Sequence, residues 1–217
     1  DIPAGDIGVG AREIGFMTGM TKKLSNRSDC VFTGKGLSYG GSLIRPEATG
    51  YGTVYFAEEM LIQTGRSLQG LRVSVSGSGN VAQYAVEKAM ALGATVISVS
   101  DSSGTVVDED GFTPAKLAEL MDIKNRNYGR VDECAKRIGA KFLEGKTPWH
   151  IPVDVALPCA TQNELTEKDA RTLVDNGVVC VAEGANMPSN NEAIRIFEDA
   201  RVLFAPGKAS NAGGVAT

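Results

Sequence analysis

The sequence lacks several features that mark whole classes of protein. Its 217 residues include one histidine and four widely separated cysteines, with no CxxC pair or His–Cys spacing of the kind that binds zinc. The cysteines fit no disulfide framework either, which favours a reduced compartment. No apolar run approaches the ~20 residues of a membrane-spanning helix. We therefore expect a cytoplasmic protein with no metal site and no membrane partner.

An excess of basic charge is also missing. Lys and Arg together number 22 against 26 Asp and Glu, which gives a formal net charge of −4. This balance provides no general attraction to polyanions, so we expect no nucleic-acid partner. The hydrophobic fraction of 42% is too high for a disordered chain. The length suits one large domain or two small ones.

The two ends of the chain suggest a piece of a longer protein. The sequence begins at Asp1 without a methionine, and residues 206–217 read as a turn followed by the start of a helix. We therefore interpret the chain as an internal segment.

Short apolar runs alternate with helical patterns along most of the chain. We expect strands at 71–75, 95–99, 153–157, 178–182 and 202–204, and helices at 6–24, 47–63, 80–92, 113–125, 131–138, 166–176 and 190–200. This alternation predicts an α/β fold: a Rossmann-like, doubly wound, mostly parallel sheet with helices on both faces. The regular alternation of strands and helices begins after about Arg45, so we place a domain boundary between residues 1–44 and 45–217.

A glycine-rich turn joins the first of these strands to the helix that follows it. Residues 77–82 read GxGxxA, in which Gly77 allows the tight turn, Gly79 lets the backbone approach a pyrophosphate and Ala82 lets the helix pack closely. The helix N-terminus adds N–H groups that suit phosphates. Such turns also occur without a ligand. The context favours a dinucleotide, because a second strand ends at Asp101, 24 positions after Gly77.

Asp101 leaves the choice of dinucleotide open. A carboxylate there usually accepts from the ribose 2′-hydroxyl and repels a 2′-phosphate, which favours NAD. Ser102, however, offers a hydroxyl donor. Lys124 and Arg130, with Arg126 between them, either form a basic cluster for a phosphate or are a solvated helix end.

Four other polar residues have two possible roles each. Asp6, in a glycine-rich stretch, is a helix cap or an acid–base group. Thr49 reaches a ligand or bonds its own helix backbone. Asn186 and Asn211 follow the last two predicted strands, where ligands of open α/β sheets bind, and either orient a ligand or cap turns.

Seven stretches together resemble the hexameric glutamate dehydrogenases of bacteria and lower eukaryotes. In the order of that family they are PAGDIGVG (3–10), GGSLIRPEATGYG (40–52), SGSGNVAQYA (76–85), SDSSGTVVDEDG (100–111), LPCATQNEL (157–165), VAEGANMP (181–188) and APGKASNAGGVAT (205–217). The SDSSG pattern resembles the NADP-dependent members. The resemblance implies a homo-hexamer that uses NADP, or else NAD, to interconvert L-glutamate with 2-oxoglutarate and ammonium.

The resemblance also implies roles for individual residues. Asp6 matches the catalytic aspartate of the family, and Gly5 matches a position whose backbone contacts the substrate. Ser102, Lys124 and Arg130 are the candidates for the 2′-phosphate. The complete predicted cofactor-binding set is Thr49, Gly77, Ser78, Gly79, Asn80, Val81, Asp101, Ser102, Lys124, Arg130, Asn186 and Asn211.

The same resemblance divides the chain between two domains. Residues 1–44 would be the tail of the substrate domain with its connecting segment, and 45–217 a dinucleotide-binding domain that is incomplete at its C-terminus. The catalytic lysine of the family lies in a loop outside this chain, so we expect the segment alone to be inactive. Two alternatives stay open: a leucine- or phenylalanine-type dehydrogenase, and a stand-alone nucleotide-binding module.

Overall fold

The computed structural model describes residues 3–6, 8–28 and 31–217. They fall into two compact units, which we describe separately: one runs to Ala48 and includes Thr217, and the other comprises residues 49–216. No helix within the described ranges is long and apolar enough to cross a membrane. Cys134, Cys159 and Cys180 are free, buried thiols, whereas Cys30 lies outside the described residues.

The first unit contains helix α1 (Ala11–Ser25) and a short 3₁₀ turn, η1 (Leu37–Tyr39). The predicted helix begins later than expected, because Gly8 has a φ of +76° and Gly10 is extended. Gly10 is the N-cap, and its N–H donates to the Glu13 carboxylate at 2.9 Å. The interpretation of Asp6 as a helix cap is therefore wrong. Its carbonyl instead accepts from the Val9 N–H at 2.8 Å in a turn before the helix.

The second unit is built on a seven-stranded sheet with the strand order β4-β3-β2-β1-β5-β6-β7. The parallel strands are β1 (Arg72–Val75), β2 (Thr95–Asp101), β5 (Val155–Leu157), β6 (Cys180–Ala182) and β7 (Leu203–Ala205). Each confirms a predicted strand, with ends shifted by one or two residues. The strand order reverses at β1, since β2 and β5 pair in parallel with its opposite sides.

Two strands at one edge of the sheet escaped prediction. They are β3 (Gly104–Val107) and β4 (Lys141–Glu144), and β3 is antiparallel to both β2 and β4. β3 follows β2 after only Ser102 and Ser103, so one apolar stretch contains a hairpin rather than a single strand. β4 is short and carries charge at both ends, as suits a sheet edge but not a recognisable apolar run.

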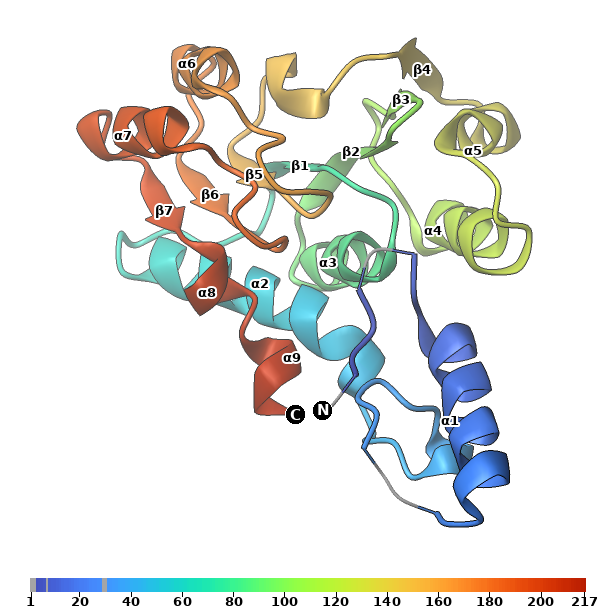
Figure 1. The fold of residues 1–217 in the computed structure, drawn as a ribbon. Coiled ribbons are helices and arrows are strands. Elements are labelled where there is room, and N and C mark those ends of the chain that lie inside the picture. Colours follow the sequence, from blue (N-terminus) through green and yellow to red (C-terminus); the bar gives the residue numbers. More distant parts are fainter. Residues whose placement is uncertain (1–2, 7, 29–30) are drawn as a thin grey trace. The chain divides into compact units, whose positions relative to one another are not determined.

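Helices cover both faces of the sheet, as the doubly wound prediction requires. The described helices that follow α1 are α2 (Arg45–Ile62), which contains the division between the units, α3 (Asn80–Ala91), α4 (Pro114–Met121), α5 (Val131–Ile138), α6 (Glu167–Asp175), α7 (Asn191–Asp199) and the short α8 (Gly207–Ser210) and α9 (Gly213–Ala216). In Figure 1, α6 and α7 lie on one side of β5–β7, with α3 on the other.

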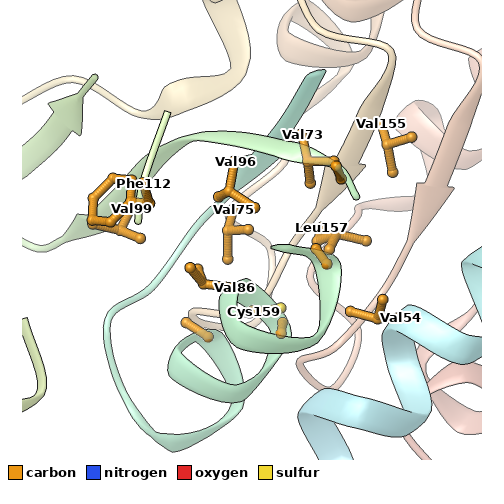
Figure 2. Packing of buried hydrophobic residues seen from close by; sticks show 14 of the residues in the cluster. Val54, Val73, Val75, Val86, Val96, Val99, Phe112, Val155, Leu157 and Cys159 are labelled. Atoms are coloured by element: carbon orange, nitrogen blue, oxygen red, sulfur yellow. The ribbon is translucent and has the colours of Figure 1, made fainter. Parts of the chain in front are cut away.

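Two hydrophobic clusters fill the space between these layers. One packs Val73, Val75 and Leu157 of the sheet against Val54 of α2 and Val86 of α3 (Figure 2). The other packs alternate strand residues against Trp149, in the turn η3 (Pro148–His150), and against α6 and α7. Neighbouring strand residues thus face opposite layers, which explains why the parallel strands are apolar throughout.

The backbones of α2 and α3 touch at Gly50. A Cβ at this position would lie 2.6 Å from the Val81 carbonyl oxygen and 2.7 Å from the Ala85 nitrogen. Both obstacles are helix backbone, so relief requires the two helices to separate. Gly50 therefore fixes how closely α2 lies against the helix that begins at the glycine-rich turn.

We predict that Gly50→Ala lowers the free energy of unfolding by about 1–3 kcal/mol through this clash. Gly19→Ala in α1 is a matched control, since a Cβ there meets nothing within 4 Å and its helix propensity improves by up to ~1 kcal/mol. Urea unfolding followed by circular dichroism measures both. Equal stability of Gly50→Ala and the parent chain would contradict the close contact.

Candidate functional site

The glycine-rich turn lies where the connections of the sheet diverge, between β1 and α3. Gly77 has a φ of +84°, and a Cβ on it would lie 2.7 Å from the Cys159 carbonyl oxygen in the loop after β5. Its N–H donates to Ser100 Oγ at 3.0 Å, and the Ser100 N–H donates back to the Gly77 carbonyl at 3.1 Å. The turn is therefore clamped between the ends of β2 and β5.

The N-cap position of α3, unlike Gly77, has room for a side chain. Gly79 is the N-cap, without a side-chain cap, and a Cβ on it would meet nothing within 4 Å. Among the described residues, no contact requires glycine at this position. The first N–H groups of a helix have no intrahelical partner, so those beginning at Asn80 are available to an anion. A dinucleotide pyrophosphate fits this exposed, uncapped helix start.

The neighbours of Gly79 support the turn from within. Ser78 is buried, and its carbonyl accepts from Gln83 Nε2 at 2.8 Å. Ala82 is fully buried, as the predicted close packing of α3 requires. Val81 is partly buried against the core. Thr49 lies on α2, one residue before the contact of Gly50 with Val81, which brings it near the start of α3.

Asp101, at the end of β2, directs its carboxylate into the protein. The side chain is 9% exposed and accepts from the Ser103 N–H at 2.8 Å and from the Val131 N–H at 3.1 Å. Lys124 Nζ lies 3.3 Å away. Burial raises the pKa of Asp101, but the hydrogen bonds from Ser103 and Val131 and the charge of Lys124 outweigh it, and the pKa falls below its usual range. The carboxylate thus organises its own loop.

The three candidate phosphate ligands gather beside this loop. Lys124 is partly buried and also donates to the Gly129 carbonyl at 3.0 Å, so its ammonium is held inside. Arg130 and Ser102 are exposed, and the Arg130 guanidinium donates to Ser102 Oγ. Arg126 fits the alternative of a solvated helix end, because its side chain is 84% exposed beside Asp122.

A single π turn, η2 (Asp122–Arg126), carries Lys124 into this position. It continues α4, and together they cover the helix predicted at 113–125. An amide pair holds it to α3: Gln83 Nε2 donates to Asn125 Oδ1 at 3.1 Å, and Asn125 Nδ2 donates to Gln83 Oε1 at 3.0 Å. The glycine-rich turn and the basic cluster are therefore built on one connected frame.

The two predicted asparagines meet at the ends of β6 and β7. Asn211 Nδ2 donates to Asn186 Oδ1 at 2.9 Å and lies 3.4 Å from the Ala185 carbonyl. Sequence reasoning missed the residue that joins their loops, Glu183. Its buried carboxylate accepts from the Gly207 N–H at 2.7 Å and the Ser189 N–H at 3.2 Å. An acidic residue directly after an apolar strand was the available signal.

A second missed acid, Glu164, lies in the loop after β5. Its Oε1 accepts from Ser76 Oγ at 2.8 Å and from the Ala160 N–H at 3.0 Å. Burial outweighs these hydrogen bonds and raises the pKa of Glu164 to about 7. Ser76 directly precedes Gly77, so this carboxyl contacts the frame of the glycine-rich turn.

Gly5 and Asp6 belong to the first unit and are both exposed. A Cβ on Gly5 would lie 2.5 Å from the Val9 carbonyl oxygen, so the turn before α1 requires glycine there. The second unit, for its part, gathers the predicted cofactor set at the carboxyl ends of its parallel strands. Ligands of open α/β sheets bind at such an edge, beside the point where the strand order reverses.

Comparison with known proteins shows the family of the chain. The model of the Glutamate/Leucine/Phenylalanine/Valine dehydrogenase family matches residues 40–217. The chain is 68% identical over its whole length to an NADP-specific glutamate dehydrogenase of Salmonella typhimurium, and 57% identical to an NAD(P)-specific glutamate dehydrogenase of Xylanibacter ruminicola. It covers 48% and 49% of those proteins.

A solved structure gives the same result. The crystal structure of Plasmodium falciparum glutamate dehydrogenase superposes with a TM-score of 0.94 at 46% identity, over 100% of this chain and 46% of that one. The chain thus spans about half the length of the relatives it matches. It belongs to the Glutamate/Leucine/Phenylalanine/Valine dehydrogenase family.

Proposed function

We propose that the chain contributes the nucleotide-binding part of an NADP-linked glutamate dehydrogenase. The complete protein would convert L-glutamate to 2-oxoglutarate and ammonium, and the reverse, as a homo-hexamer. The observation that carries the choice of NADP is the orientation of Asp101: its carboxylate faces its own loop, while Ser102 and Arg130 face outward. The 68% identity to NADP-specific glutamate dehydrogenases supports glutamate over the leucine and phenylalanine alternatives.

Each residue of the site has a physical task in this proposal. The uncapped start of α3, with Gly79 and Asn80, holds the pyrophosphate. Arg130 and Ser102 hold the 2′-phosphate by charge-assisted hydrogen bonds. The Lys124 ammonium compensates the negative charge of the Asp101 carboxylate and helps to hold it in place. Asn186 and Asn211 orient the nicotinamide and the substrate, and Thr49 lines the cofactor site from α2.

The reaction divides between cofactor and protein. When bound, the nicotinamide supplies the carbon that exchanges a hydride with the substrate. The Asp6 carboxylate moves protons on and off the amine nitrogen and carbonyl oxygen of the substrate, and the backbone at Gly5 contacts it. Residues 1–44, in this proposal, end the substrate domain. The segment alone then lacks a complete substrate site and has no turnover.

Arg130→Ala is expected to weaken NADPH binding about tenfold or more, because it removes a charge-assisted contact, and to leave NADH binding nearly unchanged. Titration of the 217-residue chain at low and moderate salt, followed by nicotinamide fluorescence, measures both. Arg126→Ala is the matched control: it removes the same side chain from a solvated position. Tighter binding of NADH than NADPH by the parent chain would overturn the choice of NADP.

Asp101→Asn is expected to destabilise the nucleotide-free chain by about 1–3 kcal/mol at pH 7, because buried donors lose a charged acceptor. Its lowered pKa means that Asp101 stabilises the fold above pH ~4, and that this stability is lost as the pH falls further. The deficit should therefore shrink in acid. Asp132→Asn, at an exposed pair with Lys136, should cost under about 0.5 kcal/mol. If Asp101→Asn left Tm unchanged, the structural role of the carboxylate would be contradicted, and a hydrogen bond to the ribose would be favoured instead.

Asp6→Asn in the protein encoded by the complete reading frame is expected to lower kcat for glutamate by about 10²–10⁴-fold while NADPH binding persists, because only the proton-transfer group is lost. Initial rates with glutamate, leucine and phenylalanine measure this and rank the substrates. Asp110→Asn changes an exposed acid in the second unit and is the control. Full activity of Asp6→Asn, or a preference for leucine, would each contradict the proposal.

A further inference from the structure

The carboxyl group of Glu164 joins two segments that meet at the reversal of strand order. Its Oε1 takes three donors: Ser76 Oγ at 2.8 Å, the Ala160 N–H at 3.0 Å and the Thr161 N–H at 3.4 Å. Ser76 belongs to the segment that leads from β1 into Gly77, and the two N–H groups belong to the loop after β5. Glu164 therefore ties that loop to the glycine-rich turn.

The tie leaves little freedom between the two segments. Ser76 is fully buried, and its Oγ also accepts from the Cys159 N–H at 2.9 Å. Its N–H donates to the Leu157 carbonyl at 3.2 Å, which extends the pairing of β1 with β5. The Cys159 carbonyl oxygen in turn lies 2.7 Å from the position that a Cβ of Gly77 would take. A change at Glu164 therefore reaches Gly77 through Ser76.

The surroundings of Glu164 oppose its negative charge. Burial is the largest effect on its pKa and raises it, the hydrogen bonds from Ser76, Ala160 and Thr161 lower it, and the charge of Asp169 on α6 raises it further, to about 7. Asp169 is itself fixed, since it accepts from the Thr166 N–H at 2.9 Å. Burial, and after it the charge of Glu164, holds the pKa of the Cys159 thiol far above neutrality, so this thiol stays uncharged.

We propose that Glu164 is a positioning residue that makes the affinity for dinucleotide phosphates depend on pH: it ties the loop after β5 to the glycine-rich turn when neutral or ionised, but repels the phosphates only when ionised. This inference rests on the proposed nucleotide site. A bound pyrophosphate brings negative charge to the start of α3, and an anionic carboxylate beside the turn raises the free energy of that complex. The complex therefore favours neutral Glu164, and binding weakens as the pH rises through about 7.

The same titration of Glu164 also makes the free energy of unfolding depend on pH, which can be measured without a nucleotide. The ordinary pKa of a glutamate is 4.5, against about 7 in the folded chain. Between these values the folded state holds a proton that the unfolded state has released. The contribution of Glu164 to stability therefore falls as the pH rises from 4.5 to about 7 and is constant above. Glu164→Gln keeps the shape, removes the charge and should abolish this pH-dependent loss.

The decisive experiment measures Kd of the 217-residue chain for NADPH and for NADH between pH 6 and 8.5 at constant ionic strength, by nicotinamide fluorescence. A change of half to one unit in the pKa of Glu164 on binding corresponds to a rise in Kd of about three- to tenfold. The Kd for NADH, which has no 2′-phosphate, should show this rise with pH as well. A 2′-phosphate, with a pKa of about 6, gains charge over this range and would tighten NADPH binding instead.

Three variants make the test specific. Glu164→Gln should bind NADH with a flat pH profile and NADPH with only the tightening due to the 2′-phosphate. Its affinity for both should be at least that of the parent at pH 8. Glu167→Gln, at an exposed pair with Arg171 on α6, should keep the parent profile. Ser76→Ala removes one hydrogen bond that favours the ionised carboxyl, so it should move the midpoint of the profile to higher pH.

The outcomes separate this inference from the proposed function. If both nucleotides bind and the Glu164→Gln profile matches that of the parent, the inference is overturned and the nucleotide site stands. An unmoved midpoint in Ser76→Ala overturns it equally, including the case in which Glu164→Gln does not fold. If neither nucleotide binds the parent chain, the proposed site fails and the inference fails with it, whatever the stability profile shows.

Discussion

Close approach of polypeptide backbone at the reversal of strand order is the constraint on which the rest of the second unit depends. Gly77 lies against the Cys159 carbonyl, and Gly50 lies against the first turn of α3. Side chains at either position would separate β1 from the loop after β5, or α2 from α3. The open helix start at Gly79 exists because both contacts hold α3 at a fixed place and angle over the sheet edge.

Electrostatics follows from this frame. Three carboxyl groups lie at the ends of strands or in the loops after them, and each is occupied by protein donors: Asp101 by its own hairpin, Glu164 by the loop after β5 and Glu183 by the start of α8. Anionic side chains would repel phosphates if they projected outward. Because protein N–H groups bind these carboxylates, the carboxylates stabilise the loops. The Arg130 guanidinium, by contrast, remains on the surface beside Ser102.

Sequence predicted the parallel strands and the long helices of this unit because burial on two faces leaves unbroken apolar runs, and 3.6-residue periodicity marks a helix over several turns. It also located the glycine-rich turn between β1 and α3. It missed β3 and β4, since a hairpin and an edge strand are defined by their partners. It missed the roles of Glu164 and Glu183, and the inward direction of Asp101, because their contacts join segments distant in sequence. The hydrogen bond from Val131 to Asp101 spans 30 residues.

The hairpin that joins β2 to β3 separates the side chains proposed to contact the nucleotide from those that hold the turn together. Asp101 and Ser103 close the turn with their own hydrogen bonds, and Ser102 between them projects outward and has no part in that closure. The same holds for the Arg130 side chain, which leaves the packing of α5 to Val131 and Cys134. Evolution can therefore exchange the outward pair with little cost to the sheet. If the proposed contacts of Ser102 and Arg130 hold, nucleotide preference can change in this architecture through two surface positions while the sheet and its hairpin stay the same.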